Sequence, residues 1–341
     1  MRAVVCQEFG PRDALVLQEI ATPVAQAGQV LLEVAACGLN FFDGLMVEGK
    51  YQTRPDRPFT PGSEVAGVVR ALGAGVTQLS LGQRVLALAG TGGYGEYVAV
   101  DASRVLPIPD SMDFQTAAGF LITYATSHHA LKDRGALQAG ETLLVLGAAG
   151  GVGLTAVEIG KRMGARVIAA ASSDEKLALC RAHGADEVIN YATQDLRTAL
   201  KDLTQGRGVD VVYDPVGGAQ SEQALRSLAL MGRHLVIGFA AGDIPKIALN
   251  LLLLKQSSLV GVFWGAFSRA NPDHHRANMA ELFGWFEAGD LQPHVSGIWP
   301  LEDFATALDT VMERRAQGKV ILDIGLTGHS KPQEFTQESI A

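Results

Sequence analysis

The fold of this 341-residue chain is decided by one stretch, Leu143-Leu144-Val145-Leu146-Gly147-Ala148-Ala149-Gly150-Gly151-Val152-Gly153. Its four leading apolar residues predict a strand buried on both faces, and the glycines that follow predict a tight turn. A helix is expected to begin directly after the turn, from about Gly151 to Met163. Strand, glycine turn and helix in this order are typical of the first unit of a doubly wound parallel sheet.

Helix-length segments and apolar runs alternate for the next hundred residues. The expected strands are 166–171, 187–189, 210–213, 234–237 and 259–264. Regular alternation of this kind gives a parallel sheet with helices on both faces. The sequence therefore predicts an α/β cofactor domain over 124–264.

The first 123 residues follow another pattern, in which Gly and Pro interrupt short apolar runs, and this favours a small β-rich domain. Two domains suit the length, because single cores stop growing at roughly 250–300 residues. After residue 264 we expect helices over 279–286 and 304–315 and a strand over 319–324. Residues 265–327 are thus expected to return to the first domain, and 328–341 to form a flexible tail.

Composition excludes several classes of protein. With 28 basic and 36 acidic side chains the formal charge is −8, which argues against nucleic acid as a partner. The three cysteines lack C-x-x-C spacing, so neither a disulfide framework nor a cysteine-rich zinc site is expected. The N-terminus lacks a secretory signal, and the most apolar stretch, 247–254, is shorter than the ~20 residues of a membrane helix. We expect a soluble, cytoplasmic protein.

The glycine turn follows the pattern A-x-G-x-x-G, because Ala148 occupies the place of the first glycine. Gly150 would let the backbone approach a pyrophosphate, and Gly153 would let the helix pack closely on the sheet. The helix N-terminus would add N–H donors. An ordinary turn is the alternative, but the strand–helix repeats favour a dinucleotide site. The residues expected to bind the dinucleotide here are Ala148, Gly150, Gly151, Val152 and Gly153.

The end of the second expected strand indicates which dinucleotide binds. NAD sites usually place an Asp or Glu there for the ribose 2′-hydroxyl, whereas this strand ends in Ala171. Ser172, Ser173 and Lys176 follow, which suits a 2′-phosphate and predicts NADPH. The alternative is that Ser173 is a helix N-cap and Lys176 is solvated beside its two acidic neighbours.

Asn40, Ser63 and the glycine turn, taken together, resemble the medium-chain dehydrogenase/reductase superfamily in its zinc-independent quinone oxidoreductase branch. The motifs that carry the resemblance are Ala36-Cys37-Gly38-Leu39-Asn40-Phe41-Phe42-Asp43, Pro61-Gly62-Ser63-Glu64-Val65-Ala66-Gly67, Ala148 to Gly153, and Val262-Phe263-Trp264-Gly265. It extends from Met1 to about Leu326 and implies a GroES-like catalytic domain beside a Rossmann-type cofactor domain. The zinc enzymes of the superfamily place Cys and His where this chain has Asn40 and Ser63, so no metal is expected.

The resemblance also implies roles for individual residues. Asn40, Tyr51 and Thr126 match active-site positions; a turn residue, a packed ring and an intrahelical hydroxyl are the respective alternatives. The residues that match cofactor contacts are Lys176, Tyr191, Phe239 and Phe263. His128 and Ser63 depart from the residues that relatives often carry there.

The implied reaction is hydride transfer from NADPH to a quinone or another α,β-unsaturated carbonyl, since activated acceptors need no metal to polarise them. An enoyl-thioester reductase and an NADPH-binding protein of low turnover are the alternatives. An apolar strand over 259–264 would leave an open sheet edge, and the relatives pair this edge across a two-fold axis. We therefore expect a homodimer.

Overall fold

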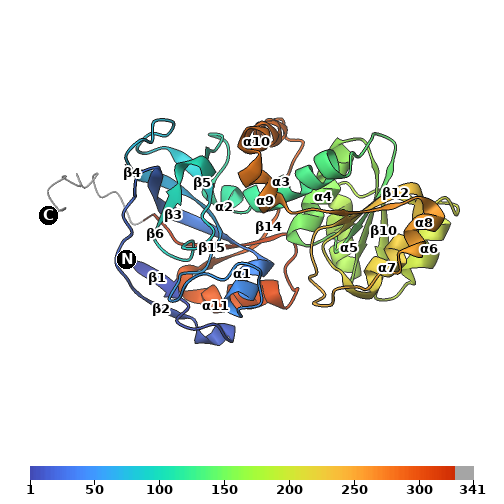
Figure 1. Ribbon diagram of the computed structural model, residues 1–341, viewed down its shortest axis with the longest axis horizontal. Helices are drawn as coiled ribbons and strands as arrows, with labels where there is room; N and C mark the ends of the chain where they lie inside the picture. Colours follow the sequence, from blue (N-terminus) through green and yellow to red (C-terminus); the bar gives the residue numbers. More distant parts are fainter. Residues whose placement is uncertain (327–341) are drawn as a thin grey trace. The chain divides into compact units, whose positions relative to one another are not determined.

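The computed structural model describes residues 1–326 as two compact units. The first unit consists of 1–118, 298–312 and the described residues from 320, and the second of 119–297 and 313–319. The predicted tail, 328–341, lies outside the described residues. Figure 1 colours the chain along its sequence and labels its elements.

The second unit is built on a six-stranded parallel sheet, which confirms the predicted doubly wound fold. Its strand order is β10-β9-β8-β11-β12-β13. The strands are β8 (Thr142–Leu146), β9 (Arg166–Ala171), β10 (Glu187–Asn190), β11 (Val209–Asp214), β12 (Leu228–Val236) and β13 (Ser258–Gly261). Leu143 to Leu146 are fully buried, as a central strand covered on both faces requires.

Helices connect and cover these strands (Figure 1). Those that pack on the strands are α4 (Gly151–Arg162), α5 (Asp174–Ala182), α6 (Leu196–Leu203), α7 (Gly218–Arg226) and α8 (Asn250–Lys255). The second unit also contains α3 (Leu121–His128), η3 (His129–Arg134), α9 (Trp264–Ala270) and α10 (Pro272–Glu287), of which α10 packs on α3 and α9. Side-chain capping determines where some of these helices begin. At the N-terminus of α6, for example, the Asp195 carboxylate accepts from the Thr198 N–H at 2.8 Å.

Several boundaries differ from the sequence-based expectation, and the strand expected over 234–237 extends from Leu228 to Val236. The strand expected over 259–264 ends at Gly261, and α9 begins at Trp264. The helix expected over 279–286 begins earlier, at Pro272, because proline suits the first helical turn. The helix expected to reach residue 315 ends at Met312, before Arg314 with its left-handed φ of 61°.

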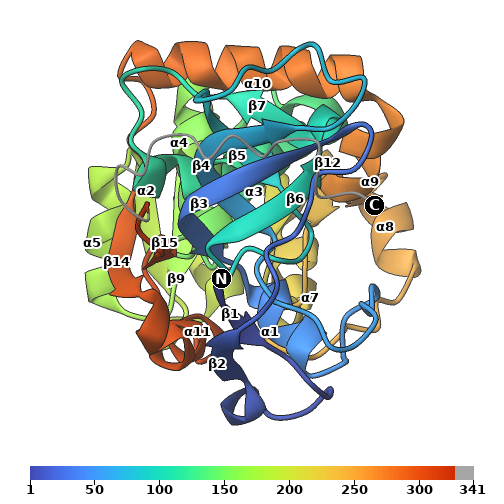
Figure 2. The same cartoon turned by 90° about the vertical axis from the view of Figure 1, so that its left-hand side faces the viewer.

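The first unit is β-rich, as its Gly- and Pro-interrupted runs predict. Its sheet has the order β14-β15-β3-β4-β5-β7, and β6 also pairs with β3. Figure 2 shows β3, β4 and β5 side by side. The elements are β1 (Arg2–Val5), η1 (Arg12–Ala14), β2 (Val16–Glu19), β3 (Gln29–Leu39), α1 (Phe41–Val47), β4 (Glu64–Leu72), β5 (Arg84–Leu88), β6 (Tyr97–Asp101), η2 (Ala102–Arg104), β7 (Val105–Pro107), α2 (Phe114–Ala118), β14 (Val295–Pro300), η4 (Leu301–Asp303), α11 (Phe304–Met312) and β15 (Lys319–Asp323).

The chain rejoins the sheet of the first unit at its end, since β15 pairs antiparallel with β3, whereas residues 265–297 belong to the second unit. The short helix α1 begins one residue after the longest strand, β3, and had no periodic signal in the sequence. Among residues 1–326, no helix has both the length and the apolar character needed to span a bilayer.

Candidate functional site

The glycine turn between β8 and α4 brings the start of the helix close to the end of the strand. A Cβ at Gly153 would lie 2.3 Å from the carbonyl oxygen of Gly147, so only glycine fits where the helix crosses the strand end. The first bond within the helix runs from the Leu154 N–H to the Gly150 carbonyl, at 2.8 Å. The N–H groups of residues 151–153 therefore have no partner within the helix and are suited to an anion.

The other loop positions differ in how closely the protein packs around them. Ala148 is fully buried, and its N–H donates to the Ala170 carbonyl at 3.1 Å, so it anchors the turn to β9. Added Cβ atoms at Gly150 and Gly151 would have no protein atom closer than 3.4 Å. Val152, like these two glycines, is half-buried. A side chain at Gly150 or Gly151 would thus meet no clash, in contrast to one at Gly153.

A polar group gathers at the end of β9. The Ser173 hydroxyl accepts from the Lys176 N–H at 3.3 Å, so Ser173 is the N-cap of α5 that the alternative interpretation describes. The Lys176 ammonium is not merely solvated, because its Nζ donates to the Arg314 carbonyl at 3.0 Å. Burial raises the pKa of Tyr191, while a hydrogen bond with Ser172 and the positive charge of Arg314 act in the opposite direction.

Arg314 is the residue of this group that sequence reasoning missed. It lies in the segment 313–319, which belongs to the second unit although it follows α11 of the first. Gln317 of the same segment donates to the Glu175 carboxylate at 2.7 Å and holds the segment against α5. The pair Arg314-Arg315 was the only signal in the sequence, and nothing local connects it with residues more than a hundred positions earlier.

Two exposed rings follow adjacent strands of the second unit. Phe239 comes after β12 and is 37% exposed, and Phe263 comes after β13 and is 60% exposed. Because Val236 and Gly261 are paired across these parallel strands, both rings leave the sheet at its carboxyl edge. Thr126 lies on α3 and is half-buried among buried neighbours. Ligands of doubly wound sheets bind outside this edge.

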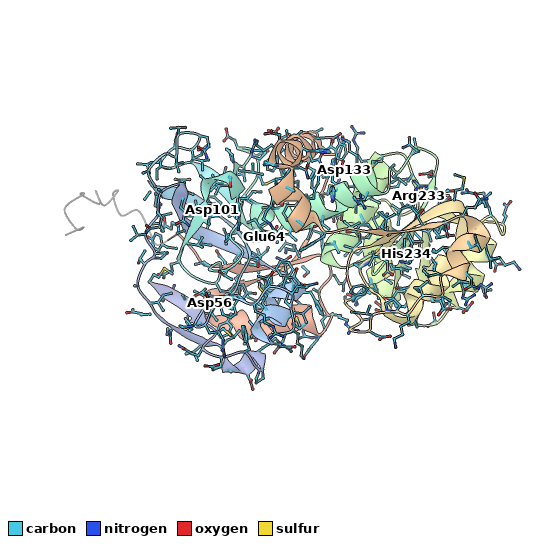
Figure 3. The ribbon with its side chains drawn as sticks, in the orientation of Figure 1. Asp56, Glu64, Asp101, Asp133, Arg233 and His234 are labelled. Carbon is cyan, nitrogen blue, oxygen red and sulfur yellow. The ribbon has the colours of Figure 1, made fainter. Side chains whose placement is uncertain are left out.

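The polar residues of the first unit form a closed cluster at the N-terminus of α1, which we call the α1 cluster: Asn40, Asp43, Ser63 and Glu64. The Asp43 carboxylate accepts from the Asn40 N–H at 2.9 Å and from the Ser63 hydroxyl at 2.7 Å. The Asn40 amide donates to the Glu64 carboxylate at 3.2 Å. Both carboxylates are fully buried, and Figure 3 labels Glu64 at the start of β4.

The composition of the α1 cluster bears on metal binding. Asn40 and Ser63 offer neutral side chains where zinc would need thiolate or imidazole ligands. Within residues 1–326, no group of three or more His, Cys, Asp or Glu side chains is arranged to hold a metal ion. The absence of a resident metal in the protein stays a prediction.

Two tyrosines lie near the α1 cluster. Tyr51 is half-buried, and its ring stacks on Phe42 of α1 with centroids 5.3 Å apart. Tyr94 is fully buried, and burial together with the nearby Asp43 carboxylate raises the pKa of its hydroxyl well above the ordinary value. Its hydroxyl oxygen has no hydrogen-bond partner in the described part of the chain. Tyr51 is the more exposed of the two side chains.

Two family models match the chain, one in each unit. The alcohol dehydrogenase GroES-like domain matches residues 26–110, and the zinc-binding dehydrogenase model matches residues 151–283. The first match agrees with the predicted GroES-like fold of the N-terminal domain.

Similar proteins match over nearly the whole length. Quinone oxidoreductase-like protein 2 of Bos taurus is 38% identical over 324 residues, which cover 95% of this chain and 92% of that protein. The structure of Escherichia coli quinone oxidoreductase complexed with NADPH has a TM-score of 0.89 at 28% identity and covers 95% and 100% of the two chains. The quinone oxidoreductase of Thermus thermophilus, solved also with NADPH, gives 0.82 at 34% identity, with 95% and 100% covered.

Proposed function

Because the chain belongs to the medium-chain dehydrogenase/reductase superfamily, in the branch of quinone oxidoreductase-like proteins, we propose that it is an NADPH-dependent reductase of quinones and other α,β-unsaturated carbonyls. The observation that carries the proposal is the end of β9. Ala171 stands where an NAD site would have a carboxylate, and beyond it the Lys176 ammonium donates to the backbone carbonyl of Arg314.

The residues of the second unit fit NADPH. We assign the pyrophosphate to the N–H groups of residues 151–153 and the 2′-phosphate to Ser172, Lys176, Tyr191 and Arg314. Positive side chains and hydroxyls are suitable partners for a doubly charged phosphate. When bound, NADPH supplies a hydride equivalent, and the protein supplies its orientation and the surrounding charge. Phe239 and Phe263 are assigned to the walls of the nicotinamide site.

We assign binding of the acceptor to residues of the first unit. Tyr51 carries a phenolic hydroxyl, which can donate a hydrogen bond to the acceptor oxygen. Asn40 of the first unit and Thr126 of the second stay the further active-site residues that the resemblance implies. Without a metal to polarise a carbonyl, acceptors that delocalise the added charge themselves are favoured, and quinones and enones do so.

Initial rates with a panel of acceptors test this proposal. We expect NADPH to support reduction of quinones and enones and NADH to support it at least 10-fold less well at equal concentration, from the loss of a charge-assisted contact. Preferred turnover of enoyl thioesters would favour the alternative enoyl-thioester reductase. Tight NADPH binding without turnover of any acceptor would favour a cofactor-binding protein instead. Equal rates with both dinucleotides would refute the assigned 2′-phosphate site.

We also propose that the protein is a homodimer joined along β13. Leu259 on this edge strand is 37% exposed, and Leu253 and Leu254 of the preceding helix α8 are 78% and 74% exposed. An unpaired apolar edge favours association, and two copies related by a two-fold axis close it. Light scattering at micromolar concentration is expected to give twice the chain mass of 36.0 kDa. A species of single-chain mass would contradict the dimer. Cytoplasmic location stays a prediction.

A further inference from the structure

One buried carboxylate of the second unit has no role in the proposed reaction, and yet it organises the carboxyl edge of the sheet. Asp214 is the last residue of β11 and is 3% exposed. Its Oδ1 accepts from the N–H groups of Val216 and Gly217, both at 2.9 Å. Its Oδ2 accepts from His234 Nε2 at 3.0 Å and from the Ser221 hydroxyl. All four bonds fix the carboxylate in one orientation.

The residues that Asp214 holds form a turn wedged beside the glycine loop. We call residues 215–217 the β11 turn. Gly147 begins the glycine loop, and a Cβ added there would lie 2.8 Å from the Val216 side chain. Val216 of the β11 turn therefore packs close to Gly147, the residue that precedes Ala148 of the glycine motif. Gly217 has φ 75° and ψ −156°, a conformation that only glycine adopts readily.

The β11 turn also carries the loop that follows β12. The Ala240 N–H donates to the Pro215 carbonyl at 3.0 Å, and the Ala241 N–H donates to the Val216 carbonyl at 2.8 Å. The Ala241 carbonyl in turn accepts from the Arg314 guanidinium at 3.2 Å. A continuous chain of contacts thus connects the Asp214 carboxylate with Arg314. Phe239 lies within this loop, next to Ala240.

His234 is the member of the group that a simple structural role explains least well. It lies on β12, is 2% exposed, and is labelled beside Arg233 in Figure 3. Its Nδ1 is buried and has no hydrogen-bond partner among residues 1–326. A buried nitrogen without a partner costs stability, and an apolar side chain at this place in the sheet would avoid the cost. The bond from Nε2 to Asp214 is the compensating contact.

We propose that His234 and Asp214 are positioning residues for the dinucleotide: the imidazole orients the carboxylate, which sets the β11 turn and, through it, the glycine loop and the loop of Phe239. The inference rests on the proposed NADPH function and adds a specific pair to it. Neither residue touches the cofactor in this scheme. Burial by itself raises the pKa of Asp214, but the hydrogen bond and charge of His234 bring that pKa below its ordinary value.

The test compares three variants of β12 by NADPH titration and by hydrogen exchange of the β11 turn. His234→Leu fills the space without a donor, and we expect roughly 10-fold weaker NADPH binding and about 10-fold faster exchange of the Val216 and Gly217 amides. His234→Gln keeps an N–H donor and is expected to stay within about threefold of the wild type for both readouts. Leu235→Val, at the fully buried neighbouring position, is the control for stability.

The control is expected to lower the melting temperature without changing NADPH affinity or exchange of the turn. Wild-type affinity in folded His234→Leu would overturn the inference, and so would faster exchange without weaker binding. Equal losses in His234→Leu and Leu235→Val would assign the effect to stability alone. If the wild type does not bind NADPH, the proposed function fails, while unchanged exchange at residues 216–217 in His234→Leu would separately refute the role of the pair.

Discussion

The α1 cluster of the first unit and the carboxyl edge of the second-unit sheet use the same kinds of polar groups in opposite ways. In the α1 cluster, the carboxylates of Asp43 and Glu64 are fully buried and accept from neighbouring side chains and N–H groups. At the sheet edge, the N–H groups of residues 151–153 lack intrahelical partners, and the Arg314 side chain is exposed.

The difference teaches which polar residues a fold uses for itself and which it leaves for a ligand. Buried polar groups must be hydrogen-bonded within the protein, so a variant in the α1 cluster is expected to reduce stability. Groups at the sheet edge face a phosphate in the proposed complex, so a variant there is expected to reduce cofactor affinity. Each prediction below tests one side of this division.

Tyr51→Phe has the largest expected effect and tests the contrast between the two regions most directly. Tyr51 stacks on Phe42 beside the α1 cluster, yet we assign it to the reaction rather than to packing. Phenylalanine keeps the ring and removes the donor, so enone turnover should fall roughly 10²–10³-fold, as for one oxyanion-hole donor. Quinone turnover should fall less, because the reduced quinone is a stabilised phenolate.

Turnover of both acceptor classes by Tyr51→Phe, together with a separate NADPH titration, decides the matter. If Tyr51→Phe reduces enones as fast as the wild type and binds NADPH equally well, Tyr51 has no role in the mechanism. The first unit would then contribute Asn40 as the next donor to replace.

Lys176→Ala tests the carboxyl edge of the second-unit sheet. Loss of a charge-assisted contact with the 2′-phosphate should weaken NADPH binding by about 10–150-fold and leave NADH binding nearly unchanged. The melting temperature should change little, because the Nζ contact with the Arg314 carbonyl is exposed. Titration of both dinucleotides into both proteins checks this, and equal losses for NADPH and NADH would refute it.

Asp43→Ala should affect stability and leave affinity alone. The change leaves the buried Asn40 N–H and the Ser63 hydroxyl without this acceptor, which should lower the free energy of unfolding by about 2–3 kcal/mol. NADPH binding to the folded variant should change little, because Asp43 itself is assigned no contact with the dinucleotide. Denaturant unfolding measures the stability, and a titration measures the NADPH affinity. A loss of affinity without a loss of stability would contradict the structural role of Asp43.

Removal of metal has the smallest expected effect, namely none. With Asn40 and Ser63 in place of thiolate and imidazole, quinone reduction should survive dialysis against a chelator. Elemental analysis before and after dialysis provides the control. One tightly bound zinc per chain, lost together with activity, would contradict a metal-free reaction.

Much of the second unit was determined by local sequence. The run Leu143 to Leu146 is apolar at every position, which only a strand covered on both faces requires, and Gly153 is needed wherever a helix crosses its own strand this closely. Ser173 is an N-cap because its hydroxyl reaches an N–H only three residues away. Such features depend on neighbours in the chain, so a pattern of residue types is enough to predict them.

Tertiary structure alone decided which distant residues meet. Lys176 contacts Arg314 across 138 positions, because the chain returns to the second unit after α11, and no periodicity records that return. Asp214 and His234 meet because parallel pairing sets β11 beside β12 in one register. The physical reason is the same in both cases: strand pairing and chain return are long-range contacts, and their partners are chosen by the packing of the whole sheet rather than by adjacent residues.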